Sequence, residues 1–113
     1  MDTKTLARFK LALEQRRAEL TEHQDASAKG RDPVALDQQS VGRVSRIDAM
    51  QQQAMAQAQE RQRTREVVRI SQALVRIDGN EFGWCLECGE DIPAKRLEID
   101  PAAALCVRCA GRT

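Results

Sequence analysis

The sequence predicts a mainly α-helical protein, in which an antiparallel two-helix coiled-coil hairpin is attached to a small C-terminal module that holds four cysteines. Apolar residues recur at spacings of three and four along two long stretches, which is typical of helices with one apolar face. Glycine and proline interrupt this pattern between the two stretches, and all four cysteines lie after residue 84. We therefore assign residues 1–78 to the hairpin, with its tip at about 27–45, and residues 79–113 to the module.

Composition limits the protein to a small core. The chain has 113 residues, of which 3% are aromatic and 31% are charged, so compact burial cannot organise its whole length. The formal net charge of +1 gives no general attraction to nucleic acid or to anionic lipid. No apolar run approaches the roughly 20 residues of a membrane span, and the N-terminus lacks the layout of a secretory signal. We expect a cytoplasmic protein that does not bind membranes.

The first helix is predicted from about Thr3 to about Ala26, with Thr3 or Asp2 as its N-terminal cap. Its apolar positions recur every three or four residues, with one arginine among them. These positions are Leu6, Phe9, Leu13, Arg16 and Leu20. This face is expected to pack against the second helix.

The second helix is predicted to be long, at least about thirty residues, and to end at Asp78-Gly79-Asn80, where glycine favours a helix stop. Its start stays open, because Ser45 followed by Asp48 resembles a capping box and Ser40 is an alternative cap. The positions of its predicted apolar face are Val44, Ile47, Gln51, Ala54, Ala58, Val67, Ile70, Leu74 and Ile77.

The connection between the helices contains Gly30 and Pro33. Both oppose helix continuation, so the two helices are expected to lie antiparallel. At about 1.5 Å per residue, each arm would reach roughly 35 to 50 Å. The middle of the second helix, residues 60–66, has no large apolar residue, which favours a projecting arm over a packed helical bundle.

The cysteines form two C-x-x-C pairs, Cys85 with Cys88 and Cys106 with Cys109, separated by seventeen residues. This spacing is typical of a structural zinc site, because each pair forms a knuckle that presents two thiolates to one tetrahedral ion. Four thiolates leave no open coordination position, so a single Zn²⁺ would be structural and not catalytic. A disulfide pair or a redox motif is the alternative, which a reducing compartment and the lack of a strand-helix-strand pattern disfavour.

Zinc would also compensate for the small size of residues 79–113, because ion binding supplies folding free energy directly. Gly89, directly after the first pair, suits a backbone that turns back toward the sulfurs. The apolar residues expected to cover the site are Phe82, Trp84, Ile92, Leu97, Ile99, Leu105 and Val107. Without zinc this end is expected to lose its structure.

A further set of residues carries a resemblance to a known family. They are Gly83-Trp84-Cys85, Cys88-Gly89, Ile92-Pro93, Arg96-Leu97-Glu98, Pro101, Leu105-Cys106 and Cys109-Ala110. In this pattern, with a helical hairpin before it, the chain resembles the DksA/TraR family of C4-type zinc-finger RNA polymerase regulators, also called DnaK-suppressor proteins. The resemblance is detailed from about Asp78 to Ala110 and architectural before that, and it carries the family's zinc ligands directly onto the four cysteines.

The resemblance implies regulation without catalysis. In such proteins the hairpin enters the secondary channel of RNA polymerase, its tip approaches the active centre, and the zinc module docks at the channel rim. A protein of this kind binds polymerase, not a promoter sequence, and changes the lifetime of open promoter complexes. We therefore expect a monomeric transcription regulator that is not an enzyme, and the one histidine, His23, is expected on a helix surface and not at a general-base site.

The family's acidic tip, an Asp-x-x-Asp-x-Ala motif, does not occur here in that form. The nearest acids are Asp32, Asp37 and Asp48. We prefer Asp37 and Asp48 as tip residues that contact the polymerase active centre. A solvated loop acid or a helix cap is the ordinary alternative for each of them.

Family members that respond to the alarmone guanosine tetraphosphate use basic residues around the zinc module. Arg96 matches one such position and Arg69 a second on the helix, so both are candidates for contact with the alarmone or with polymerase. Asp100 and Ala110, however, stand where those members carry arginine and lysine, and an acid repels a polyanion. The resemblance leaves the alarmone response open, with Asp100 arguing against it.

Two other functions fit parts of the sequence. A coiled-coil adaptor would join its hairpin to another helix and use the zinc module only as a staple. A nucleic-acid-binding zinc module would meet phosphates with basic side chains, and its binding would fall steeply with salt. The side chains in question are Lys95, Arg96, Arg108 and Arg112.

Overall fold

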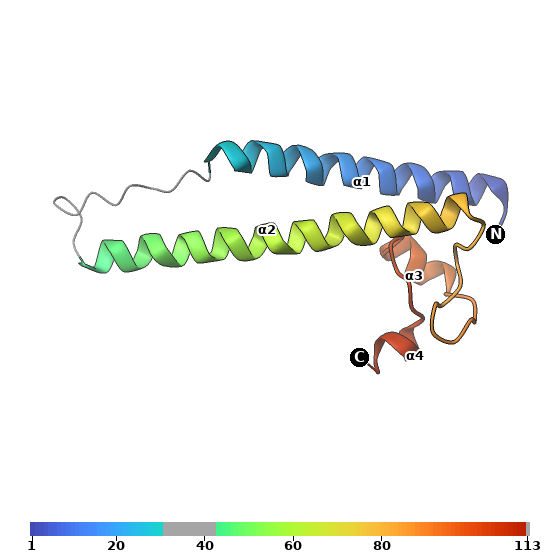
Figure 1. Cartoon of the computed structure of the whole chain (residues 1–113). Coiled ribbons are helices and arrows are strands. Elements are labelled where there is room, and N and C mark those ends of the chain that lie inside the picture. Colours follow the sequence, from blue (N-terminus) through green and yellow to red (C-terminus); the bar gives the residue numbers. More distant parts are fainter. Residues whose placement is uncertain (31–42, 113) are drawn as a thin grey trace.

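Two long helices lie side by side and antiparallel in the computed structural model, which describes residues 1–30 and 43–112 (Figure 1). They are α1, Thr3–Gly30, and α2, Arg43–Asp78; the short helices α3, Ala94–Ile99, and α4, Val107–Ala110, follow them. The described residues hold no strand, only an isolated antiparallel bridge between Trp84 and Asp91. The molecule measures 63 × 30 × 19 Å along its principal axes. The predicted fold class, a helical hairpin with a small cysteine-bearing end, is confirmed.

Helix α1 begins at the predicted residue, Thr3, and ends later than the predicted Ala26. The carboxylate of Asp2 accepts a hydrogen bond from the backbone N–H of Thr5 at 2.7 Å, so Asp2 and not Thr3 is the cap. Hydrogen bonds from Thr5 lower the pKa of Asp2 below its usual value, which is typical of a carboxylate at a helix N-terminus. The predicted end at Ala26 is wrong by one turn, because no helix breaker occurs before Gly30.

Helix α2 has 36 residues and begins at Arg43. Ser45 lies inside its first turn, so the capping box with Asp48 is wrong, and Ser40 lies outside the described residues. The helix ends at Asp78, as predicted. The left-handed residue that closes this end is Asn80, with φ 58°, whereas Gly79 keeps a negative φ. Asparagine tolerates this conformation better than other side chains that carry a Cβ.

The hairpin is packed at its base and open towards its far end. One cluster of buried residues joins both helices to the C-terminal module; its members are Phe9, Leu13, Leu20, Ile70, Ala73, Leu74, Ile77, Phe82, Cys85, Ile92, Leu97, Ala102, Ala103, Cys106 and Cys109. In contrast, Ile47 is 48% exposed and every residue from 51 to 59 is exposed. The predicted apolar face of α2 is therefore wrong over this stretch. Described α1 ends at Gly30, and the first turns of α2 extend beyond it (Figure 1).

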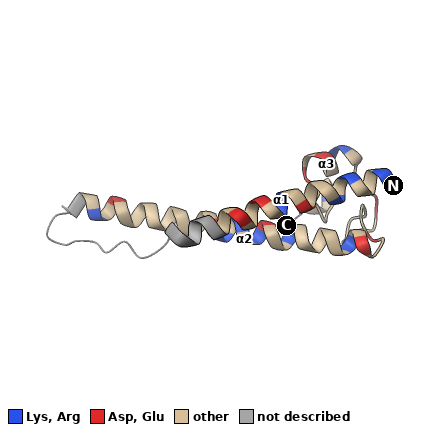
Figure 2. Ribbon diagram, turned by 90° about the horizontal axis from the view of Figure 1, so that it is seen from above, with Lys and Arg blue, Asp and Glu red and all other residues tan. Residues whose placement is uncertain are grey.

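Polar pairs take over where the apolar core ends. The Arg16 guanidinium donates to both carboxylate oxygens of Glu66, at 3.0 and 3.4 Å, and Gln24 donates to the Thr64 hydroxyl at 3.1 Å. The sequence places Arg16 on the apolar face of the first helix. In the structure Arg16 instead connects α1 to α2 through its ion pair with Glu66. Beyond these pairs, Figure 2 shows a stretch of α2 with few charges, which in the sequence is the uncharged run from residue 49 to residue 59.

Candidate metal centre

The first cysteine knuckle is a tight loop built by backbone hydrogen bonds. Cys85 donates its N–H to the carbonyl of Glu90 at 2.8 Å, and Gly89 donates to the carbonyl of Cys85 at 2.9 Å. Gly89 has φ 75°, a left-handed conformation that glycine adopts without strain. The expected turn directly after the first cysteine pair is confirmed.

The second knuckle begins helix α4. Cys106 is the N-cap, and its sulfur accepts a hydrogen bond from the backbone N–H of Cys109 at 3.5 Å. A backbone bond of 2.9 Å from Leu86 to Ala104 connects the first knuckle to the segment that leads into the second. Two segments far apart in the sequence are thereby held face to face.

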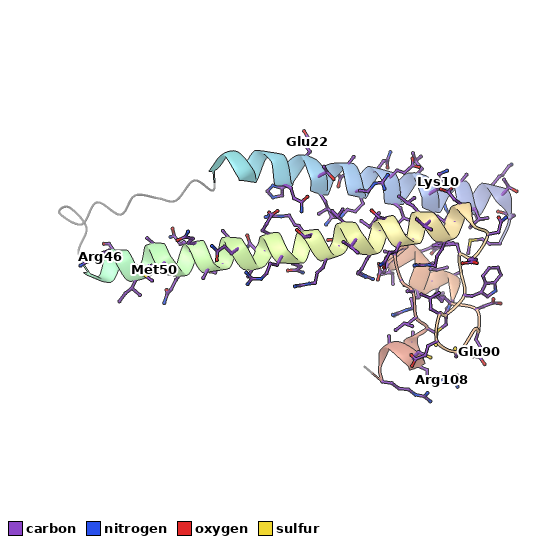
Figure 3. All side chains as sticks on the ribbon, viewed as in Figure 1. Lys10, Glu22, Arg46, Met50, Glu90 and Arg108 are labelled. Atoms are coloured by element: carbon purple, nitrogen blue, oxygen red, sulfur yellow. The ribbon has the colours of Figure 1, made fainter. Side chains whose placement is uncertain are left out.

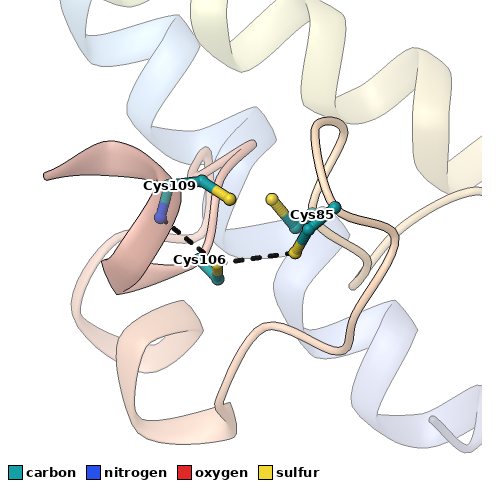
Figure 4. Close-up of side chains that lie close together, drawn as sticks. Cys85, Cys106 and Cys109 are labelled. Carbon is teal, nitrogen blue, oxygen red and sulfur yellow. Dashed lines mark hydrogen bonds between the residues drawn. The ribbon is translucent and has the colours of Figure 1, made fainter. Parts of the chain in front are cut away.

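The four sulfurs form one compact group (Figure 4). All four Sγ atoms lie within 4.8 Å of one another, and those of Cys88 and Cys106 are 3.7 Å apart. A tetrahedral zinc ion with Zn–S bonds of about 2.3 Å places its sulfurs about 3.8 Å apart. The cysteines are free thiols and not disulfides, so the group fits a four-coordinate zinc ion and argues against the disulfide alternative.

The protonation of these thiols also suits a cation. Burial alone would raise the pKa of Cys85, but backbone N–H groups directed at its sulfur outweigh it and lower the pKa to about 6. The N–H of Cys109 lowers the pKa of Cys106. The Cys109 thiol donates towards Cys106 and is buried, which raises its pKa to about 12. Negative charge therefore gathers on part of the group, and a bound Zn²⁺ lets all four sulfurs be thiolates.

Helix α3 and the loop before it fix the metal centre on the base of the hairpin. Leu97 is fully buried, and the rings of Phe9 and Phe82 lie 5.7 Å apart between centroids. Of the residues expected to cover the site, Phe82, Ile92 and Leu97 are buried and Leu105 is half-buried. The expectation is wrong for Trp84, Ile99 and Val107, which are 46%, 87% and 62% exposed. Three alanines of this module and of α2 are buried in the same core cluster; they are Ala73, Ala102 and Ala103.

Both basic candidates lie at this junction, each with a partner inside the chain. Arg69 on α2 forms an ion pair of 2.8 Å with Asp100, and Arg96 donates to the Leu105 carbonyl at 3.0 Å. The pairing of Arg69 with Asp100 carries no signal in the sequence, because the two residues lie 31 positions apart and follow no shared periodicity.

The acidic candidates lie away from the metal centre. Asp48 is an exposed residue of α2, between Arg46 and Met50 at the end of that helix remote from α3 and α4 (Figure 3). Asp37 lies outside the described residues. At about 1.5 Å per residue, the helix separates Asp48 from Asp78 by roughly 45 Å.

The metal centre matches a known zinc-finger family. A family profile described as the prokaryotic dksA/traR C4-type zinc finger matches residues 80–113. Together with the four clustered sulfurs, this match identifies one structural zinc ion, held by the predicted cysteines. Within the described residues, no helix has the length and apolar character needed to cross a membrane.

Similar proteins extend the match along the chain. The RNA polymerase-binding transcription factor DksA of Escherichia coli is 30% identical to this chain, and the match covers 96% of this chain and 71% of the E. coli protein. The protein of the same name from Haemophilus influenzae is 42% identical over a shorter match, which covers 43% of this chain and 34% of the H. influenzae protein. Transcription factor DksA2 from Pseudomonas aeruginosa has a TM-score of 0.81 and 23% identity, covering 99% of this chain and 84% of that one. An RNA polymerase binding protein and transcriptional regulator from Chlamydia trachomatis has a TM-score of 0.62 and 19% identity, covering 99% and 90%. Similarity to the E. coli protein over 96% of this chain and 71% of that protein, a shared hairpin fold and the matching zinc finger establish that this chain belongs to the DksA/TraR family.

Proposed function

We propose that this protein binds RNA polymerase through the secondary channel of the enzyme and modulates the stability of open promoter complexes, and with it initiation. The observation that carries the proposal is the similarity to DksA of E. coli, an RNA polymerase-binding transcription factor, over 96% of this chain. The family consists of transcription factors, and the chain is not an enzyme. As a regulator of bacterial polymerase it would act in the cytoplasm, as a monomer and without reading a DNA sequence.

The shape of the hairpin supports entry into a channel. The molecule is 63 Å long and 19 Å across its narrowest axis, and α2 alone extends for about 54 Å. Residues 51–59 of α2 are all exposed, so this part of the helix is free to lie against walls of polymerase. In this proposal residues 1–78 form the inserted arm, and residues 79–113 form the zinc module that docks at the channel rim.

Asp48 and Asp37 are the proposed tip contacts with the polymerase active centre. Asp48 is exposed near the far end of α2, where a carboxylate can accept hydrogen bonds from basic side chains of polymerase. Its place inside the helix removes the cap as an alternative role. The ordinary alternative that remains for Asp48 is a solvated acid on a helix surface.

The binding experiment uses the zinc-loaded chain, RNA polymerase and a promoter whose open complex has a measurable lifetime. We expect a complex at micromolar concentration and a changed lifetime. Asp48→Asn should keep the binding but reduce the lifetime effect on the order of ten-fold, as expected when a hydrogen bond from a basic side chain loses its charged acceptor. Failure of the wild-type chain to bind polymerase at micromolar concentration would rule the proposed function out.

Glu22→Gln is the matched control for the tip variant. Glu22 is an exposed acid of α1 that points away from α2 (Figure 3), and its substitution removes the same charge from the middle of the arm. We expect Glu22→Gln to regulate as the wild type does. Equal effects of the two variants would assign Asp48 to the solvated helix surface.

The contacts of Arg69 and Arg96 support regulation that does not depend on guanosine tetraphosphate. Arg69 forms an ion pair with Asp100 at 2.8 Å, and Arg96 donates its Nε–H to the Leu105 carbonyl, so both guanidinium groups already have a partner inside the chain. We therefore expect the open-complex lifetime with this protein to be the same with and without the alarmone, measured with polymerase whose other alarmone sites are removed. A change that appears only when this protein is present would contradict the proposal.

A further inference from the structure

The surroundings of the zinc centre are acidic. Four thiolates around one Zn²⁺ leave two units of net negative charge. The loop of the first knuckle adds Glu87, Glu90 and Asp91, and no basic residue occurs from Cys85 until Lys95. Cys88, in the middle of this loop, is the exposed member of the four cysteines, whereas the other three are buried. Cys88 is therefore the sulfur that protons, chelators and alkylating reagents reach first.

One cation reaches this acidic loop from the other knuckle. Arg108 lies between Cys106 and Cys109 on α4, and its Nη2 is 3.8 Å from a carboxylate oxygen of Glu90. Both side chains are labelled in Figure 3, on the side of the module away from the hairpin. The ion pair thus joins the second knuckle to the loop of the first knuckle, two residues after Cys88.

We propose that Arg108 is a positioning residue of the zinc centre, which ties the first knuckle to the second through Glu90 and shields the Cys88 sulfur. The inference concerns zinc retention and is independent of the proposed action on polymerase. A guanidinium donates hydrogen bonds without ever losing its charge, which suits it to a site of excess negative charge. Residues that contact metal ligands commonly alter metal affinity by about 10- to 100-fold when they are replaced.

An ordinary surface ion pair would predict something different. The Arg108 and Glu90 side chains are 61% and 72% exposed, so their pair contributes little to folding. Loss of Arg108 should therefore leave the helical content and the thermal midpoint of the zinc-loaded protein nearly unchanged. Its effect should appear in the rate at which zinc leaves and in the reactivity of Cys88.

The test compares zinc transfer from the full chain to a chromogenic chelator. Arg108→Gln removes the charge and keeps a polar side chain, and we expect its zinc to leave about ten-fold faster than that of the wild type. Arg108→Lys keeps the charge and should restore most of the retention. The second readout is alkylation of the zinc-loaded protein, in which mass spectrometry of peptides should find Cys88 modified faster in Arg108→Gln.

Arg112→Gln is the matched control, because it removes the same charge four residues further along the chain. We expect its zinc transfer and its Cys88 alkylation to match those of the wild type. Equal rates for Arg108→Gln and Arg112→Gln would overturn the proposal, since net charge alone would then explain any change. A rate for Arg108→Lys as fast as that for Arg108→Gln would overturn it equally.

Discussion

Removal of zinc from the folded protein is expected to unfold residues 79–113. Structural zinc contributes about 10–16 kcal/mol of apparent folding free energy in small fingers, and the other supports of this end are two helices of six and four residues. Trp84 is the only tryptophan of the chain and precedes Cys85, so its fluorescence reports on the first knuckle. A strong chelator should shift that fluorescence towards the solvent-exposed value and release one zinc per chain.

The hairpin should respond as well, because it shares its core with the zinc module. Phe9, Leu13 and Ile70 belong to the same buried cluster as Phe82 and Leu97. Loss of the module exposes apolar area on both long helices, which costs about 25 cal/mol for each Å². We expect the thermal midpoint of the helical circular dichroism signal to fall by ten degrees or more, roughly what a loss of a few kcal/mol produces at this size.

A pair of variants in the second knuckle provides the control for metal removal. Cys106→Ser removes one thiolate and should abolish stoichiometric zinc, whereas Val107→Ser alters an adjacent residue that is 62% exposed and should retain it. If chelation left both the fluorescence and the melting curve unchanged, or if elemental analysis found no zinc in the wild type, the structural role of the metal would be disproved.

The parts of the fold that could be predicted are those with local signals. The two cysteine pairs predict a metal site from the sequence alone, because the C-x-x-C spacing sets the geometry of a knuckle. The end of α2 at Asp78 follows from the glycine and asparagine after it. These features depend on neighbours within a few positions, so a single sequence contains them completely.

The wrong predictions concern burial, which depends on packing partners that are distant in the sequence. Ala54 and Ala58 have the spacing of an apolar face, yet both are exposed, as is every residue from 51 to 59. Ile99 is apolar and was expected to cover the zinc, yet its position on the six-residue α3 directs it to solvent, while Leu97 two positions earlier is buried. Periodicity indicates which residues share a face, and tertiary packing decides whether that face is covered.

Leu97→Ala is expected to be among the most damaging substitutions outside the cysteines. Leu97 is fully buried and belongs to the cluster that joins the hairpin base to the metal centre. Truncation of a buried leucine costs about 2–5 kcal/mol, and small domains are stable by only about 5–15 kcal/mol. The urea midpoint of the zinc-loaded protein should therefore fall by roughly a third.

Ile99→Ala makes the comparison specific to burial. Ile99 lies on the same short helix and is 87% exposed, so its truncation should change the free energy of unfolding by no more than about 0.5 kcal/mol. Both variants lose apolar side-chain carbons from one six-residue helix, so a difference between their urea midpoints measures packing and not helix propensity. Similar midpoints for the two variants would mean that α3 does not hold the zinc module to the hairpin. Leu97 would then have no central role in the core that the two parts share.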